Sequence, residues 1–417
     1  MDTKLKLKIL NFLQFFAWGA WLLTVGSYIA ETFGPNDIGW KIGAAYGTMG
    51  FASLFMPALL GIVADKWVNA ERVLGISHLI LGGLLIVLAN VTDYSVFYPI
   101  IFLVSMFYMP TIALDNAVSY AVLEKEKFDI IKVFPPIRVW GTVGFILAVW
   151  TVNIFGWRVS INQFYLSAGV SIVLGLYSFT LPQIKPSKSS EKKSLAQQFG
   201  LDAFVLFKRK KMAIFFIFAM LLGCVLQISN MWGEQFLDSF KNIDIYKDSF
   251  IVENALSFLS LSMISEALFI LSIPFFLKRF GIKQVMLMSM VAWALRFALF
   301  GIGNPGTGII FLTLSMIVYG MAFDFFNISG SLFVEKESNE KIRSSSQGLF
   351  MLMTNGLGAI IGAYGSGYVV DLYSENGVAD WPTIWFIFAI YSVIVTIAFA
   401  LVFKYKHDPN EELEVKH

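Results

Sequence analysis

Long apolar stretches alternate with short breaks of charged, glycine or proline residues along almost the whole chain. A helix needs about 20 apolar residues to cross the hydrocarbon core of a bilayer. Twelve stretches reach this length, at roughly 6–30, 39–63, 71–92, 96–118, 136–156, 162–182, 211–235, 250–278, 282–303, 306–333, 344–371 and 382–404. The pattern predicts an all-α polytopic membrane protein with twelve transmembrane helices.

One break is much longer than the others. It reads LPQIKPSKSSEKKSLAQQFGLDAFVLFKRKK and lies between the sixth and seventh stretches. A basic segment that contains serine and proline is typical of a boundary between structural units. We therefore expect an N-terminal six-helix bundle at 1–182, a cytoplasmic linker at 183–210, a C-terminal six-helix bundle at 211–404 and a cytoplasmic tail at 405–417.

The basic residues predict the orientation. An even number of spans places both termini on one side, and most of the 31 Lys and Arg residues lie at the N-terminus, in the even-numbered connections, in the tail or at the adjoining span edges. The other side holds only Lys41, Arg158, Lys241 and Lys247. By the positive-inside rule both termini are cytoplasmic. The basic start MDTKLKLKIL precedes an apolar stretch without a clear cleavage site, so we expect a retained first helix and not a signal peptide.

Composition narrows the function classes. With 57% hydrophobic residues, 14% charged residues and a mean hydropathy of +0.69, the chain differs from an ordinary soluble domain. Cys224 stands alone in LLGCVLQ and is expected to be a buried, inert thiol. His78, His407 and His417 lack partners at metal-ligand spacing. We expect no metal, no cofactor, no enzymatic activity and no nucleic-acid partner.

The tenth stretch contains an ionisable residue where one is costly. In YGMAFDFFNISGS, Asp324 lies within a mostly apolar run, and an intramembrane carboxylate is a functional candidate by default. At helical spacing Asp324 shares a narrow arc with Gly320, Asn327 and Ser331. Aromatic residues flank this arc, at Tyr319 and Phe323.

Three other stretches carry polar side chains at helical spacing. They are Gly223, Gln227, Asn230 and Glu234 in the seventh, Ser262 and Glu266 in the eighth, and Arg138, Thr142 and Phe145 in the fifth, which opens with Pro135 and Pro136 at an expected helix start. Together they suit a small, neutral, hydrogen-bonding ligand with a flat ring. The alternative is that polar residues only hold helices together. That alternative is at least as good for Ser262 and Ser331, and weakest for Arg138, Glu266 and Asp324.

The carboxylates also offer a route for ion coupling. Desolvation and a nearby arginine act in opposite directions on a carboxylate, so opening and closing a site can bind and release a proton. Asp324 and Glu266 are the candidates for proton coupling. Asp115 is expected either to pair with Arg138 or to approach the cytoplasmic water, and Arg296 has no obvious partner and is assigned a structural role.

A charged turn follows the second stretch of each half. The first reads GIVADKWVNAER and the second PFFLKRFGIKQ. With twelve spans and a basic central linker, this repeat resembles the major facilitator superfamily, which implies a site between two halves that rock to expose it alternately. Asp65, Lys66 and Arg72 are then candidates for a cytoplasmic gate. The alternative is that these charges only satisfy the positive-inside topology.

Several segments resemble one family in particular. KLKLKILNFLQFFAWGAWL, MPALLGIVADKW, FPPIRVWGT, KMAIFFIFAMLLG, VAWALRFALF and SMIVYGMAFDFFNISGSLFVEKE are similar to those of the bacterial nucleoside:proton symporters, from end to end. The resemblance implies import of purine and pyrimidine nucleosides with protons across the inner membrane. It also implies a nucleoside site lined by Arg138, Thr142, Phe145, Gln227, Asn230, Glu266, Tyr319, Phe323 and Asp324.

The sequence departs from this family pattern at one position. Met263 stands where a glutamine is expected, three residues before Glu266. A thioether cannot donate a hydrogen bond, so nucleobase preference is left open. Elsewhere we expect nucleoside and proton as co-substrates, a lipid bilayer as the environment and a monomer.

Other functions remain to be distinguished. A proton-coupled sugar symporter of the same superfamily is the main alternative, since carboxylates and an aromatic face also bind sugars. A drug or metabolite exporter fits less well, because promiscuous export sites favour apolar cavities. A membrane enzyme or sensor fits least, because no catalytic motif and no signalling domain is present.

Overall fold

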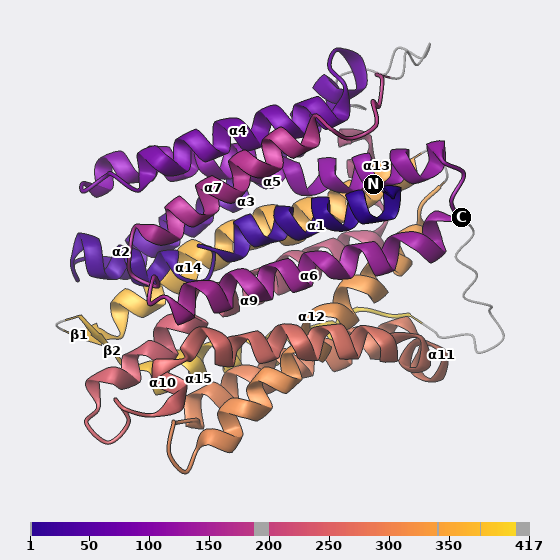
Figure 1. Ribbon diagram of the computed structural model, residues 1–417. Coiled ribbons are helices and arrows are strands. Elements are labelled where there is room, and N and C mark those ends of the chain that lie inside the picture. The colour runs from indigo at the N-terminus through magenta and orange to yellow at the C-terminus, as the bar shows by residue number, and fades with distance from the viewer. Residues whose placement is uncertain (1, 187–199, 340–341, 376, 406–417) are drawn as a thin grey trace. The chain divides into compact units, whose positions relative to one another are not determined.

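The computed structural model describes residues 2–186, 200–339, 342–375 and 377–405. Part of the expected linker (187–199) and most of the expected tail (406–417) therefore lie outside the described residues. Contacts divide the chain into two compact units, Met1–Phe199 and Gly200–His417, here called the N-terminal and C-terminal units. The units are described separately below. Helices dominate both (Figure 1).

The N-terminal unit is helical throughout its described part. Its helices are α1 (Thr3–Gly19), α2 (Val25–Phe33), α3 (Ile38–Lys66), α4 (Ala70–Leu88), α5 (Tyr94–Lys125), α6 (Ile130–Ile154) and α7 (Asn162–Ser178). Within this unit α1 runs along α6, α3 along α5 and α4 along α7 (Figure 1). Gly144 permits the closest approach, since a Cβ there would lie 2.2 Å from the Phe12 carbonyl oxygen of α1.

The first predicted helix is interrupted. We expected one helix to about Ala30, but α1 ends at Gly19 and α2 begins at Val25. Backbone and side-chain donors satisfy the carbonyl groups at the break: the Tyr46 hydroxyl donates to the Leu22 oxygen, and the Thr24 and Val25 N–H groups donate to the Trp21 oxygen at 3.1 Å and 2.9 Å. These bonds explain how a break is tolerated inside an apolar segment.

The proposed start of α6 was wrong. Pro135 and Pro136 were expected to open the helix, whereas the helix begins at Ile130 and both prolines lie inside it. Asp129 provides the start instead, because its Oδ1 accepts a hydrogen bond from the Lys132 backbone N–H at 3.4 Å. Both prolines lie beyond the first four residues of α6, so each removes one backbone hydrogen bond from the helix interior.

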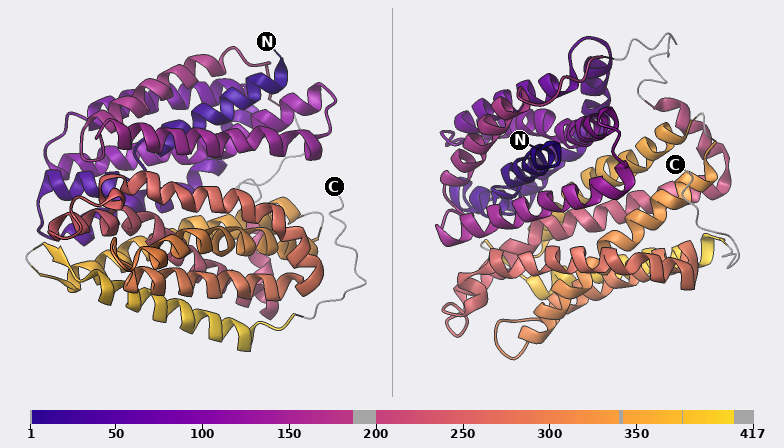
Figure 2. Two further views of the ribbon diagram at one scale, coloured as in Figure 1. Left: turned by 60° about the horizontal axis from the view of Figure 1, so that its bottom comes forward. Right: turned by 45° about the vertical axis from the view of Figure 1, so that its right-hand side comes forward.

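The C-terminal unit contains longer and less regular helices. They are η1 (Leu201–Lys208), α9 (Lys210–Ser239), η2 (Phe240–Asn242), α10 (Phe250–Glu253), α11 (Ala255–Ile302), α12 (Ile309–Glu337), α13 (Arg343–Met351), the π-helical η4 (Leu352–Gly358), α14 (Ala359–Leu372) and α15 (Trp381–Val402). A hairpin of β1 (Ser374–Glu375) and β2 (Val378–Ala379) precedes α15. In this unit α11 and α12 lie side by side (Figure 2).

Two predicted spans are joined in α11. The helix assignment runs for 48 residues, but Gly281 adopts φ 76° and ψ 169° inside it. This left-handed φ is open to glycine and breaks the helix between the two predicted spans. The turn predicted after the eighth span is therefore made by the non-helical backbone of Gly281 alone.

The membrane-spanning character is clear from helix length and composition. Within the described residues, nine helices are long and apolar enough to cross a membrane. The α11 assignment is one of the nine although it covers two predicted spans. Both α1 and α7 contain 17 residues, just under the length of 18 that defines such a span.

Candidate functional site

Asp324 is buried in the middle of α12, as its position within an apolar run predicted. Its side chain is 6% exposed, and its Oδ2 has no hydrogen-bond partner among the described residues. Glu266 of α11 is close enough to interact with it electrostatically. Gly320, one turn before Asp324, allows this proximity, since a Cβ there would lie 2.6 Å from the Ser265 backbone. The two candidate proton carriers therefore belong to one cluster.

Aromatic rings lie beside this acidic pair. Tyr319 and Phe323, one turn apart on α12, stack with ring centroids 6.0 Å apart and an interplanar angle of 4°. Trp293 of α11 meets Tyr319 edge to face at 5.7 Å and 86°. Glu266 and Asp324 also interact electrostatically with Tyr319. The cluster thus combines carboxylates with flat, rigid ring faces.

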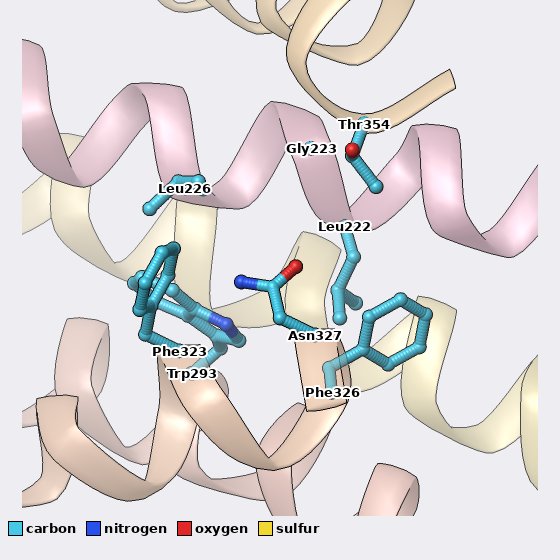
Figure 3. Close-up of a pocket in the computed structure, with 8 residues that line it drawn as sticks. All are labelled: Leu222, Gly223, Leu226, Trp293, Phe323, Phe326, Asn327 and Thr354. Atoms are coloured by element: carbon cyan, nitrogen blue, oxygen red, sulfur yellow. The ribbon is translucent and has the colours of Figure 1, made fainter. Parts of the chain in front are cut away.

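A small cavity opens next to the ring pair. Figure 3 shows Asn327 pointing toward α9, between the rings of Phe323 and Trp293 on one side and that of Phe326 on the other. Leu222, Gly223 and Leu226 of α9 line it, with Thr354 of η4. Gly223 is essential to this contact because a Cβ there would lie 2.2 Å from the Thr354 carbonyl oxygen.

Of the nine predicted site residues, only Phe323 lines this cavity. Gln227 and Asn230 are half-buried on α9, and Gln227 Nε2 has no hydrogen-bond partner among the described residues. Asn327 was placed on the polar arc from the sequence but was not predicted as a site residue. Its helical spacing from Asp324 was the signal for including it.

Arg296 has partners that the sequence did not reveal. It is 2% exposed on α11 and donates from Nε to Ser229 Oγ of α9 at 3.1 Å. Its Nη1 donates to Ser262 Oγ at 3.3 Å and to the Ser315 carbonyl oxygen of α12 at 2.8 Å. The guanidinium carbon lies 4.5 Å from the centre of the Tyr319 ring.

Ser262 and Ser331 make contacts of the kind expected if polar residues only hold helices together. Ser262 is buried and accepts the bond from Arg296. Ser331 donates to Gln347 Oε1 of α13 at 3.0 Å, and Gln347 Nε2 donates to the Ser331 carbonyl oxygen at 2.9 Å. Ser331 therefore connects α12 to α13, and Ser262 connects the two parts of α11 on either side of Gly281.

The N-terminal unit holds the other three predicted site residues, all on α6. Arg138 places its guanidinium carbon 4.0 Å from the Phe15 ring of α1, and Phe145 meets Trp18 edge to face at 6.1 Å. Thr142 is half-buried on the same helix. The side chains of Arg138 and Phe145 are thus fixed against aromatic residues of α1.

Asp115 does not reach water. It is 0% exposed on α5, and neither carboxyl oxygen has a hydrogen-bond partner among the described residues. It interacts electrostatically with Arg138, without an ion pair to any described residue. The predicted approach to cytoplasmic water is therefore wrong, and the other alternative holds only as a longer-range interaction.

Buried polar residues of the N-terminal unit form a short chain of hydrogen bonds, although His78 Nδ1 has no partner among the described residues. His78 Nε2 and Gln14 Oε1 are 2.7 Å apart, and Gln14 Nε2 donates to Thr111 Oγ1 at 2.8 Å. This chain connects α4, α1 and α5, which gives His78 a structural role. Cys224 is buried, as predicted, and the described residues contain no group of His, Cys, Asp and Glu that could hold a metal ion.

The charged turn after α3 contains an anchor that the sequence analysis missed. Asp65, Lys66 and Arg72 are exposed, whereas Glu71 is 2% exposed. Glu71 Oε2 accepts a hydrogen bond from the Ile184 backbone N–H at 3.0 Å, and Oε1 accepts one from Asn69 Nδ2 at 3.0 Å. Glu71 therefore connects this turn to the segment after α7. From the sequence, only Asp65, Lys66 and Arg72 stand out in this turn, because they match a charged motif.

Comparison with known proteins gives consistent matches along the whole chain. The family model described as Nucleoside H+ symporter matches residues 1–408. The nucleoside permease NupG of Escherichia coli (strain K12) is 53% identical over 408 residues, which cover 98% of this chain and 97% of that protein. The xanthosine permease of the same organism is 50% identical over 418 residues, which cover 100% of this chain and 99% of that protein.

Solved structures match as well. A crystal structure of the nucleoside transporter NupG superposes with a TM-score of 0.90 at 53% identity, over 97% of this chain and 100% of that one. A crystal structure of the peptide transporter POT has a TM-score of 0.71 at 14% identity, over 96% and 94% of the two chains, and shows the fold alone. The fold is that of a major facilitator superfamily transporter.

These matches decide between the functions left open by the sequence. The family and the curated relatives are transporters and not enzymes, and they do not favour the sugar symporter. The spans and the bacterial permeases support a multi-pass protein of the bacterial inner membrane. The chain belongs to the nucleoside H+ symporter family.

Proposed function

We propose that this protein imports purine and pyrimidine nucleosides together with protons by alternating access. The observation that carries the proposal is the cluster of Asp324 and Glu266 with the stacked rings of Tyr319 and Phe323. Carboxylates accept hydrogen bonds from a ribose diol, and ring faces stack on a base. The family to which the chain belongs uses both co-substrates.

The half-buried amides would read the base. Gln227 and Asn230 each present a donor and an acceptor, which match the edges of nucleobases. Phe145, Phe323 and Tyr319 offer faces for stacking, worth ~1–3 kcal/mol in comparable contacts. Arg138 and Thr142 complete the proposed set. Met263, half-buried beside Ser262, removes a possible amide contact, so base discrimination falls chiefly on α9.

Asp324 is the stronger candidate for the proton. A buried carboxylate is costly to ionise when one of its oxygens lacks a hydrogen-bond partner and a second carboxylate is near, as at Asp324 Oδ2 and Glu266. A bound substrate would give Asp324 a hydrogen-bond partner, and opening to the other side of the membrane would expose it to water. One proton moving down 100 mV releases about 2.3 kcal/mol, enough for more than tenfold accumulation.

The topology of the proposal is the one predicted from the sequence. Twelve spans result if Gly281 divides α11, if α1 and α2 share one span, and if α13, η4 and α14 share another. Residues 1–182 and 211–404 would then form six-helix bundles, with residues 183–210 as a cytoplasmic linker and 405–417 as a cytoplasmic tail. The distribution of Lys and Arg supports cytoplasmic termini. We propose a monomer in the lipid bilayer as the working unit.

The proposed gate is at the end of α3 and the start of α4. Asp65, Lys66 and Arg72 are exposed there, so they are available to contact other segments as the transporter changes state. Asp65 has no hydrogen bond or ion pair to another described residue. Its charge would favour one state by a few tenths to about 1 kcal/mol, the range for exposed pairs.

Uptake into proteoliposomes tests the proposal. Labelled uridine and adenosine are offered with and without an inward proton gradient, in the presence of excess ribose or a disaccharide. We expect gradient-stimulated uptake of both nucleosides and no competition by the sugars. Nucleoside uptake that is equal with and without the proton gradient, or that excess sugar abolishes, would overturn the proposed function.

A further inference from the structure

Arg296 is a buried cation held by three helices. It donates hydrogen bonds to Ser229 of α9, to Ser262 in the first part of α11 and to the Ser315 carbonyl of α12. No described carboxylate lies within ion-pair distance of it. A guanidinium buried without a counter-ion is costly, and a neutral side chain could connect helices at lower cost. Its presence needs a further reason.

The three partners of Arg296 lie beside proposed site residues. Ser229 directly precedes Asn230 on α9. Ser262 lies one helical turn before Glu266 on α11, and Ser315 lies one turn before Tyr319 on α12. The planar fork of an arginine has donors in fixed directions, so it sets the positions of its three acceptors relative to one another. Lysine has no such geometry.

Besides these hydrogen bonds, Arg296 contacts two aromatic rings, Phe300 at 4.9 Å and Tyr319 of the proposed site. Its guanidinium carbon lies 4.5 Å from the centre of the Tyr319 ring, in the range of cation–π attraction. Trp293, almost one turn before Arg296 on α11, packs against the same ring edge to face. On α12, Phe323 stacks parallel to it. The Tyr319 ring is thus fixed by Arg296, Trp293 and Phe323 together.

We propose that Arg296 is a positioning residue for nucleoside binding, which acts by fixing the Tyr319 ring and the adjoining turns of α9, α11 and α12. This inference rests on the proposed function. It predicts an effect on nucleoside affinity that depends on the Tyr319 ring. A role in stability alone predicts an effect that does not depend on that ring.

A double-mutant cycle separates the two roles. Dissociation constants for uridine and adenosine are measured on detergent-solubilised protein for the unmodified chain, Arg296→Met, Tyr319→Leu and the double variant. We expect Arg296→Met to raise the dissociation constant about tenfold, as loss of a desolvated cation–π contact implies. In the Tyr319→Leu background the same change should have less than a twofold effect. Equal effects in both backgrounds would overturn the inference.

Two controls keep the test decisive. Ser105→Ala removes the buried hydrogen bond between Thr48 Oγ1 of α3 and Ser105 Oγ of α5, 2.7 Å long, which lies in the N-terminal unit and involves no partner of Arg296. It should lower thermal stability without changing affinity, and a tenfold loss of affinity here would attribute the Arg296 effect to destabilisation. If Arg296→Met does not fold, Arg296→Lys replaces it in the cycle.

Arg296→Lys also tests the geometry. It keeps a cation near Tyr319 but cannot donate to all three partners at once, so we expect an intermediate loss of affinity that again depends on the Tyr319 ring. Affinity equal to that of the unmodified chain would overturn the role of the fork. If the unmodified chain binds no nucleoside, the proposed function fails. If it binds nucleoside but the Arg296 and Tyr319 effects are additive, only the positioning role of Arg296 fails.

Discussion

Phe323 lies parallel to Tyr319 one turn earlier on α12, with ring centroids 6.0 Å apart and planes 4° apart. Phe323 also lines the cavity beside α9, whereas Tyr319 does not line it and contacts Arg296. This arrangement predicts which aromatic residue affects substrate binding most directly.

Phe323→Leu should raise the KM for nucleoside uptake about tenfold, because base stacking on an aromatic face is worth ~1–3 kcal/mol. Phe325→Leu is the matched control. Phe325 lies on the other face of α12 and is buried against Phe269 and Phe276. The Phe325→Leu change should lower the free energy of unfolding by about 1–2 kcal/mol and leave the KM for nucleoside uptake unchanged. Equal KM changes in the two variants would contradict stacking at Phe323.

Gly320→Ala should destabilise the protein and lower transport. The added Cβ would lie 2.6 Å from the Ser265 backbone, so α11 and α12 must separate where Glu266 and Asp324 interact. We expect a loss of about 1–3 kcal/mol, typical of overpacking. Gly365→Ala on α14 meets nothing within 4 Å and should raise stability by up to ~1 kcal/mol. Thermal unfolding of both variants measures the difference, and a stable Gly320→Ala would show that the helices are not tightly packed.

Asp115→Asn should stabilise the protein. The Asp115 carboxyl is wholly buried without a hydrogen-bond partner among the described residues, and a neutral amide of the same shape is less costly to bury. The gain comes only from removing the buried charge, since the amide remains unpaired, and should be on the order of 1 kcal/mol. Thermal unfolding in detergent measures it. Marked destabilisation would show that Arg138 requires the charge of Asp115.

Glu71→Gln should destabilise the N-terminal unit, whereas Arg72→Gln should not. Glu71 is buried and accepts hydrogen bonds from Ile184 N–H and Asn69, and bonds to a charged acceptor are worth about 1.5–3 kcal/mol. Arg72 is exposed, so its replacement should alter transport rate if it gates and leave unfolding unchanged. Thermal unfolding and uptake rates, measured on both variants, separate the two roles. A destabilised Arg72→Gln would show that the charges of this turn are structural.

The sequence predicted a helical membrane protein and the polar arc around Asp324 because both depend on local pattern. Asp324 stands out in an apolar run, and its arc with Gly320 and Asn327 follows from helical spacing alone. Helical spacing could not place Glu266 beside Asp324, since that requires knowing that α11 and α12 pack against each other. From the sequence, the two carboxylates are grouped by their chemistry, as candidate proton carriers, and not by position.

Features that depend on tertiary contacts were missed. The break between α1 and α2 relies on a hydrogen bond from Tyr46 of α3, and nothing near Leu22 in the sequence announces it. The partners of Arg296 come from three helices far apart along the chain. Glu71 resembles any charged residue of a turn until Ile184 is seen to bond to it. Each of these needs the fold before the contact can be recognised.

Proton coupling through Asp324 is the central claim, and a comparison of accumulation with exchange tests it most directly. Proteoliposomes that hold the unmodified chain, Asp324→Asn or Asp115→Asn are assayed for uridine accumulation driven by a proton gradient and for exchange of labelled against unlabelled uridine without a gradient. The account predicts that Asp324→Asn loses accumulation and keeps exchange, while Asp115→Asn, which removes another buried carboxylate, keeps both. Accumulation by Asp324→Asn equal to that of the unmodified chain would contradict it.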